Sequence, residues 1–459
     1  MHRLTILNPF FYYTKSVLFF VVLHLISISA VAGSHPKDKR DLNIKKNDAG
    51  VIFYSSADFG IGSVDEDLFL MLMLEQGIAV KNLKLVFSGP FRFRIKDNTP
   101  LDSGVLRNQD WDDASDWARI LRSADYNQTL DNGRIDIHLG ELNGVSMGSG
   151  SIINDYFNSI DMDYYQGGAA LAVDINGTGI EFMMHNVISP GIFAGRTYIS
   201  PFAWFSDNSL SRRFSIGFDF ALDTGVDGQI VPQSNSTIFI AGGNIDFNFI
   251  QTRNIFLSFL VDVNGLRKSG GVDAGIGSSF FINRQKETEL HITGKYLYAG
   301  KKYYSSLINP FYEYNRRWFS VDPVSGVTQS FAEHLDNSAV KKRSAHGFSA
   351  DLELSAGETF KIGFNYTYQN HNRPDWLMFR FELSPVERFS LRGFFAGQDM
   401  FGSSNIFSSY SLAGLSLQIK IIGSLRVYFE FLRRYRNIKS SVSSASNEIS
   451  GGIGVSIAY

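Results

Sequence analysis

Four carboxylates stand close together in the segment Asp110-Trp111-Asp112-Asp113-Ala114-Ser115-Asp116-Trp117. Carboxylate oxygens are the ligands that a hard cation such as calcium requires. The segment departs from the helix-flanked calcium loop, because its sixth residue is Ser115 instead of Gly and its twelfth is Leu121 instead of Glu. We therefore expect a helical turn capped by Asp113 or Ser115, or a solvated loop, and keep calcium binding as the alternative.

A second segment has the spacing of a serine nucleophile. Gly144-Val145-Ser146-Met147-Gly148 matches G-x-S-x-G, but that motif needs a strand–turn–helix in a parallel sheet with a His and an acid nearby. Its continuation, Ser149-Gly150-Ser151, favours a glycine-serine loop. The aromatic and acidic residues that follow suit a loop that constricts a pore, stacks on a sugar or plugs an interior. With the acidic segment included, the constriction-loop candidates are Asp110, Asp112, Asp113, Asp155, Tyr156, Asp161 and Asp163.

Histidines provide the remaining candidates for acid–base chemistry. His138, His185, His291 and His371 qualify by residue type alone, since no motif ties a Ser or an acid to any of them. The chain has 0 Cys, which excludes thiol nucleophiles and Cys-ligated metals. A lipid-modifying enzyme therefore stays a minor alternative, and we predict no catalytic residue and no resident cofactor.

Most charged residues stand in short segments where apolar and polar residues alternate, as in Thr359–Tyr368, Phe214–Leu222 and Ile453–Tyr459. A strand points successive side chains to opposite faces, so the large aromatic set lies on one face and the charges on the other. If the aromatic face meets lipid, Lys or Arg there would cost about 2–4 kcal/mol, which forces the charges inward. The pore-lining candidates are Lys84, Arg92, Arg94, Asp219, Asp246, Lys361, Arg380, Glu382, Arg392, Arg426 and Glu430.

Such segments recur through the chain and predict about 20 strands of roughly ten residues each. Counted back from Tyr459, the connections at 321–345, 399–406 and 437–448 lie on one side, whereas those at 96–115 and 143–163 lie on the other. Either one strand is misassigned, a missing strand at 50–59 being one option, or the first half folds its long segments into the lumen. We expect an even number between 16 and 20. The predicted strands are 66–76, 82–95, 116–127, 133–142, 164–174, 178–188, 193–203, 211–223, 236–250, 254–265, 270–283, 288–299, 305–320, 346–356, 359–370, 375–384, 388–398, 407–421, 424–436 and 449–459.

The composition and the first residues of the chain further restrict the class of protein. The chain has 459 residues and a net charge of -2, so it offers no basic field for nucleic acid. Mean hydropathy is -0.06, and no long apolar stretch follows the first residues, which predicts no membrane helix but allows a barrel with a polar lumen. An apolar run from Val17 to Ile28, followed by Ala30-Val31-Ala32, predicts a cleaved signal peptide over 1–32. A disordered leader at 33–48 and a barrel over 49–459 complete the predicted organisation.

The aromatic-ended last strand resembles the terminal strand of bacterial outer-membrane β-barrels, and most of the chain is similar to that porin-like superfamily without matching one named family. The resemblance implies insertion by the barrel-assembly machinery, contact with outer-membrane lipid, and passage of small solutes. We therefore predict an all-β transmembrane antiparallel β-barrel in the bacterial outer membrane, acting as a porin-like passive channel. The alternative is a barrel that anchors, or serves as a portal for, a surface structure or a secretion system.

Overall fold

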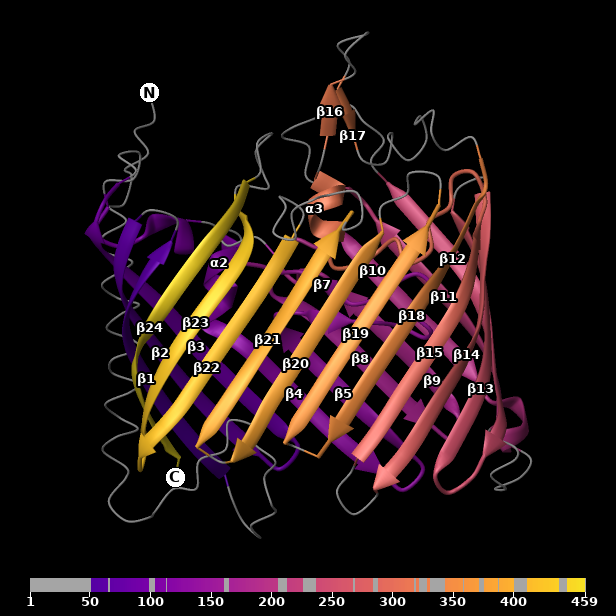
Figure 1. Cartoon of the computed structure of the whole chain (residues 1–459), viewed down its shortest axis with the longest axis horizontal. Coiled ribbons are helices and arrows are strands. Elements are labelled where there is room, and N and C mark those ends of the chain that lie inside the picture. Colours follow the sequence, from indigo (N-terminus) through magenta and orange to yellow (C-terminus); the bar gives the residue numbers. More distant parts are fainter. Residues whose placement is uncertain are drawn as a thin grey trace, which may run out of the picture.

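The chain folds into one closed antiparallel barrel (Figure 1). The computed structural model describes residues 51–64, 67–98, 104–112, 114–160, 165–204, 213–225, 237–266, 269–283, 288–317, 319–321, 328–330, 343–357, 359–370, 375–386, 388–399, 411–436 and 444–458. The predicted signal peptide and leader, and Tyr459, lie outside these residues. The strands of the 20-stranded barrel sheet are β1 (Val51–Val64), β2 (Asp67–Val80), β3 (Leu83–Lys96), β4 (Leu121–Leu130), β5 (Gly133–Gly140), β8 (Gly168–Ile175), β9 (Thr178–Met184), β10 (Ile192–Ile199), β11 (Phe214–Asp223), β12 (Ile238–Gln251), β13 (Ile255–Leu266), β14 (Ser269–Asn283), β15 (Thr288–Ala299), β18 (Ala345–Ala356), β19 (Phe360–Gln369), β20 (Trp376–Val386), β21 (Phe389–Gln398), β22 (Ser411–Ile422), β23 (Leu425–Arg436) and β24 (Ser444–Ala458).

Each barrel strand pairs with the next one along the chain, and the sheet closes where β1 meets β24. The closing pair runs antiparallel from Tyr54 opposite Ala458 to Val64 opposite Glu448. Closure pairs the first strand with the last, so no edge strand is left to which another chain could add a strand. The predicted all-β transmembrane barrel is confirmed.

The alternation of side chains separates an apolar outer face from a polar inner face. Phe59, Ile245 and Phe429 are 58%, 43% and 40% exposed, although they are large and apolar. Asp219 and Asn365 occupy the opposite parity and are buried. A soluble fold would have reversed this arrangement, so the outer face fits contact with lipid hydrocarbon.

The strand prediction was wrong at two places, and the two errors offset each other in the total. The barrel begins with β1, which the prediction had offered only as an option at 50–59, and residues 305–320 form no barrel strand. There the chain makes a loop and α3 (Tyr312–Arg317), whose aromatic residues pack inside the barrel instead of against lipid. Without a barrel strand at 305–320, each strand before this segment runs in the direction opposite to the predicted one. The connections after β3, β5 and β15 then all join at the end of the barrel opposite the C-terminus, as Figure 1 shows.

The barrel wall is uneven in height. β5, β8 and β10 have 8 residues and β9 has 7, whereas β12 has 14 and β14 has 15. Beside this low stretch, β4 pairs only with Leu83–Phe87 of β3. The segment Val105–Arg107 pairs with Arg92–Arg94 of β3 instead, because Arg94 N donates to Val105 O and Arg107 N to Arg92 O.

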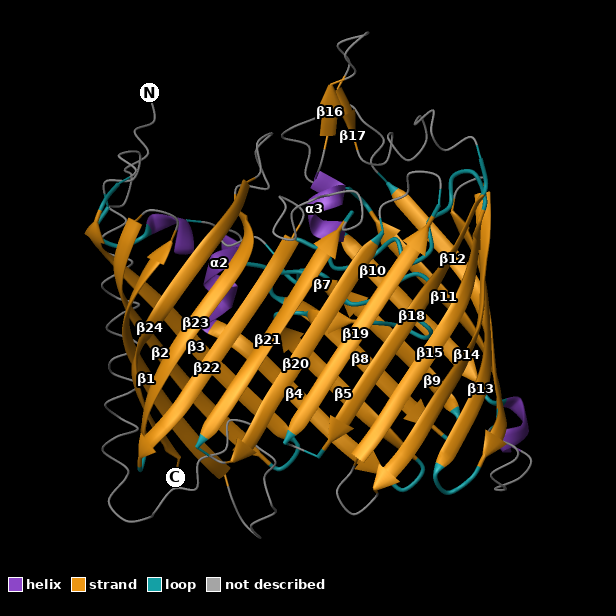
Figure 2. Cartoon of the chain, in the orientation of Figure 1, coloured by secondary structure: helices purple, strands orange, loops and turns teal. Residues whose placement is uncertain are grey.

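The remaining elements are short (Figure 2). They are the helical turns η1 (Asn108–Asp110), α2 (Ala114–Trp117), η2 (Ala118–Ile120) and η3 (Pro201–Trp204), and the strand pairs β6 (Asn143–Val145) with β7 (Tyr156–Phe157) and β16 (Phe319–Val321) with β17 (Thr328–Ser330). The acidic segment does form a helical turn, α2, but Ser115 lies inside this turn and not at its N-cap, and Asp113 lies outside the described residues. No helix among the residues listed above has the length and apolar character needed to cross a membrane.

Candidate functional site

Two segments fold into the lumen and hold one another there. We name residues 141–160 the lumen loop and residues 300–317 the lumen strap. Their backbones form a parallel bridge between Ile153 and Ile308, and Ser306 N donates to Ser151 O at 2.7 Å. Apolar side chains of both segments pack in one buried cluster with inner-face residues of β9 to β15, such as Met183, Ile240 and Leu266.

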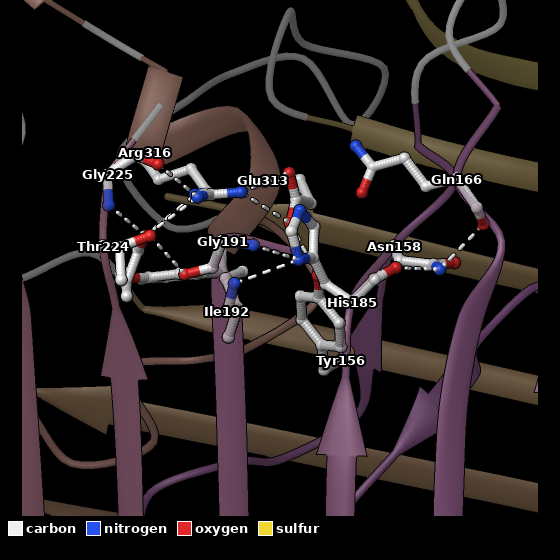
Figure 3. Close-up of polar contacts among 12 residues, drawn as sticks. Tyr156, Asn158, Gln166, His185, Gly191, Ile192, Thr224, Gly225, Glu313 and Arg316 are labelled. Carbon is white, nitrogen blue, oxygen red and sulfur yellow. Dashed lines mark hydrogen bonds and ion pairs between the residues drawn. The ribbon is translucent and has the colours of Figure 1, made fainter. Parts of the chain in front are cut away.

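A buried polar network ties both segments to the rim of β9, β10 and β11 (Figure 3). Tyr156 donates to Glu313 Oε1 at 2.5 Å, and Arg316 forms an ion pair with Asp223 at 2.8 Å. Burial, reinforced by the Glu313 carboxylate, raises the pKa of Tyr156 well above its usual range, so its hydroxyl stays a donor. Tyr312 donates to the same Asp223 carboxylate at 2.8 Å. The network therefore fixes loop, strap and wall as one unit.

Asn158 and His185 extend this attachment to the next strands. The Asn158 amide donates to the backbone carbonyls of His185, at 2.7 Å, and of Gln166, at 2.8 Å. His185 Nδ1 accepts from the backbone N–H groups of Gly191 and Ile192 at 3.2 and 3.0 Å. This nitrogen is committed to two structural hydrogen bonds, which argues against the predicted option of a general base.

The tip of the lumen loop rests on acidic residues of the wall. Ser149 Oγ donates to Asp262 Oδ2 at 2.6 Å, and the Gly148 N–H points to Glu181 Oε2 at 3.4 Å. Lys295 donates to the Ser149 carbonyl oxygen. Ser146 of the G-x-S-x-G match accepts from the Asp155 N–H at 2.8 Å and donates to Asn154 Oδ1 at 3.3 Å, so its hydroxyl bonds within the loop itself.

The other side of the lumen loop reaches the opposite wall. Asp155 forms an ion pair with Arg380 of β20 at 2.9 Å and accepts from the Asn365 amide of β19 at 3.2 Å. Burial raises the pKa of the Asp155 carboxyl, and Arg380 only partly offsets this effect. Phe157 stacks on Phe394 of β21 with ring centroids 6.0 Å apart. The loop thus spans the lumen from wall to wall.

Between the lumen loop and strands β19 to β23 lies a cavity of about 670 Å³. Several of its charged groups remain open to water: the side chains of Lys361, Arg392 and Arg380 are 55%, 46% and 38% exposed. Apolar residues such as Phe394 and Met378 line another part of it. The charged residues that line the cavity are Arg122, Glu141, Glu353, Lys361, Arg380, Glu382, Arg392, Glu430, Arg433 and Arg434.

The structure divides the predicted pore-lining residues into three groups. Lys361, Arg380, Glu382, Arg392 and Glu430 line the cavity together. Asp219 and Asp246 lie on the opposite wall, where both pair with Arg196 at 3.3 Å. The others lie near the β1–β3 side, where the cross-strand partner of Lys84 is Asp125, Arg92 pairs with Glu448, Arg94 with Asp67 and Arg426 with Asp58.

The acidic segment contributes one buried carboxylate, Asp110, which is surrounded by arginines. Arg92 and Arg107 approach it to 2.7 Å and Arg119 to 3.5 Å. Burial alone would raise the pKa of Asp110, but the guanidinium groups outweigh it and hold that pKa far below its usual range. Asp112 is exposed, and Asp113, Asp161 and Asp163 lie outside the described residues. In the part of the chain that the structure describes, no three His, Asp or Glu side chains gather as ligands for calcium or another metal.

Two further histidines form hydrogen bonds that no sequence motif indicated. His291 Nδ1 lies 2.8 Å from Ser279 Oγ, and its Nε2 lies 3.1 Å from Glu289. Ser279 and His291 are direct cross-strand partners on β14 and β15, as expected of a polar pair on an inner barrel face. His138 pairs with Asp125 at 2.6 Å in the same manner, and His371 lies outside the described residues.

The sequence prediction missed Asp58, Glu181 and Arg196. Asp58 belongs to the strand that was left out of the count. Arg196 stands among small residues in β10, where no apolar stripe marks the outer face. Glu181 had a usable signal, because Ile180 and Phe182 flank it with the outward parity.

No protein-family model matches the chain, and no curated protein matches it. Solved structures with a similar fold include Wzi from Escherichia coli, described as an outer-membrane, carbohydrate-binding β-barrel involved in group 1 capsule assembly (9% identity, 88% of this chain and 84% of that one, TM-score 0.34). They also include the outer membrane protein OpdK from Pseudomonas aeruginosa (9%, 89% and 99%, 0.32) and the siderophore receptor PirA from Acinetobacter baumannii (10%, 90% and 81%, 0.33). The fold itself is a closed antiparallel barrel with an apolar outside, as the alternation of side chains predicted.

Proposed function

We propose that the protein is a porin-like channel that lets small polar solutes pass the bacterial outer membrane passively. The supporting observation is the cavity between the lumen loop and β19–β23, whose charged side chains remain exposed to water instead of being sealed into the wall. Charges kept in water inside a low-dielectric wall act on passing ions and dipoles. The lumen loop would then be the constriction that limits the size of the solute.

Single-channel recording of the purified barrel in a planar bilayer tests this function. We expect stepwise conductance, and a sharp increase when residues Gly144 to Ser159 are deleted, because the deletion removes the segment that spans the lumen. A deletion variant that still migrates faster unheated than boiled on a detergent gel retains its barrel. Silence of both proteins would contradict the channel.

The second candidate is a barrel that anchors a surface structure or serves as a portal for a secretion system. The buried apolar cluster of lumen loop and lumen strap favours it, because such packing seals part of the lumen. A silent bilayer before and after the deletion, together with a specific partner recovered by pull-down, would support this role. Purified protein that conducts alone would argue against it.

The route to the membrane is part of the proposal. Cleavage near Ala32 would release the chain, and the barrel-assembly machinery would read the last strand, in which Ile453 and Val455 face outward. Replacing Tyr459 with Asp should lower the amount of protein in the outer-membrane fraction. Unchanged amounts would show that another segment is read, and recovery in the soluble periplasm would contradict the location.

A further inference from the structure

Charge is segregated around the inner wall. The register places the inner-face charged residues of β8 to β18 in one continuous arc, in which carboxylates far outnumber cations. We name this arc the acidic wall. Its carboxylates are Asp174, Glu181, Asp219, Asp223, Asp246, Asp262, Asp273, Glu289, Asp351 and Glu353, and its cations are Arg196 and Lys295.

Strands β19 to β23 carry the opposite balance. We name their inner face the basic wall. Its cations are Lys361, Arg380, Arg392, Lys420, Arg426 and Arg434, and its carboxylates are Glu382 and Glu430.

The two walls also differ in how far water reaches them. At the centre of the acidic wall, Asp219, Asp262 and Asp273 are 5%, 1% and 0% exposed, whereas the Glu289 and Glu353 side chains nearer its end are each 34% exposed. The tip of the lumen loop covers Asp262 through Ser149, and the strap covers Asp273 through Ser305. On the basic wall, the Lys361 and Arg392 side chains are 55% and 46% exposed. The water-filled part of the lumen therefore faces the basic wall.

We propose that the lumen loop masks the acidic wall and thereby makes the channel selective for small anions. This inference rests on the proposed channel and adds its substrate class. Exposed charge within a Debye length, about 10 Å at 0.1 M salt, dominates the potential that a passing ion meets, and charge covered by protein contributes less to ion partitioning. Removing the loop also frees Arg380 from Asp155 and Lys295 from the Ser149 carbonyl oxygen, but it uncovers Asp262 and Glu181 and opens the lumen to a wall that carries ten carboxylates and two cations. The net change therefore favours cations.

Reversal potentials across a potassium chloride gradient provide the test. The full-length barrel should prefer chloride, and deletion of Gly144 to Ser159 should move its reversal potential toward potassium. A smaller deletion, Gly148 to Gly150, removes only the tip that contacts Glu181 and Asp262, and should cause a smaller shift in the same direction. Heat-modifiable migration on a detergent gel identifies the folded variants.

Neutralising variants separate masking from a general loss of charge. Asp262→Asn should leave the reversal potential of the full-length barrel unchanged and shift that of the loop-deleted barrel toward chloride. Arg392→Gln should reduce chloride preference in the full-length barrel. An equal effect of Asp262→Asn in both backgrounds, or no shift on deletion, overturns the inference while leaving a channel. A silent bilayer overturns the proposed function and the selectivity together.

Discussion

Two ion pairs in opposite halves of the lumen have the same length and different surroundings. Arg316 of the lumen strap and Asp223 of β11 lie 2.8 Å apart with side chains 4% and 2% exposed. Arg392 and Glu382, on the cavity side, also lie 2.8 Å apart but are 46% and 35% exposed. The covered pair holds segments together, whereas the open pair is available to ions. Coverage by the folded-in segments, and not the strand pattern, distinguishes the two halves.

The covered pair should give the largest effect on stability. Arg316→Met leaves Asp223 buried with its main cation removed, which should lower the free energy of unfolding by about 3–5 kcal/mol. Arg392→Met, the matched change in the open half, should cost no more than about 1 kcal/mol. Urea unfolding in lipid vesicles measures both variants. Equal costs would remove the distinction between the two halves.

A charge introduced on the outer face should have the next largest effect on the free energy of unfolding. Phe429→Lys brings an ammonium into hydrocarbon and should cost about 2–4 kcal/mol. Gln418→Lys, on the inner face of the neighbouring strand, is the control and should cost little. Asn365, although it also points inward, is a poor control because its amide holds Asn154 and Asp155 of the lumen loop. The same unfolding assay applies, and similar losses at Phe429 and Gln418 would contradict the assigned faces.

The ion pair between Arg380 and Asp155, which joins the two halves, should have an intermediate effect on stability. Arg380→Gln removes the cation from Asp155, a carboxylate only 3% exposed, and should destabilise the attachment of the lumen loop by about 1–3 kcal/mol. We expect faster proteolysis within the lumen loop and noisier channel currents, with the barrel itself intact. Lys361→Gln, on the same wall but paired with Glu353, is the control. Identical proteolysis of both variants would show that Arg380 does not hold the loop.

The smallest effect concerns pH. Because the folded-state pKa of Asp155 is raised by burial, the folded protein binds this proton more tightly than the unfolded chain. Its contribution to stability therefore grows as pH falls through the folded pKa, and levels off below the ordinary value of about 3.9. Relative to Asp155→Asn, wild-type protein should gain stability between pH 7 and pH 4 in thermal melts. A relative loss over this range would contradict the sign.

Local alternation was sufficient to predict the barrel, because the lipid face imposes large apolar residues on every second position. It failed at β1, where Ser55, Ala57 and Ser63 replace large outward residues and weaken the pattern. It also failed at 305–320, where Leu307, Ile308 and Phe311 are apolar because they pack inside. Parity identified Lys361, Arg380 and Arg392 as inward. It gave no information on which inward charges a distant loop covers, since that depends on contacts such as Ser149 with Asp262, 113 residues apart.

The unequal strand lengths have a consequence for the surrounding bilayer. With a rise of about 3.3 Å per residue and a tilt near 45°, the 8 residues of β8 span about 19 Å, and the 15 residues of β14 span about 35 Å. The usual apolar band is about 25 Å tall, so the regular strands on one side of the barrel are shorter than this band. We expect lipid to thin beside β8 to β10, or the barrel axis to lean. Either response gives the protein an orientation in the plane of its membrane, with a thin flank where neighbouring lipids and proteins meet a different bilayer.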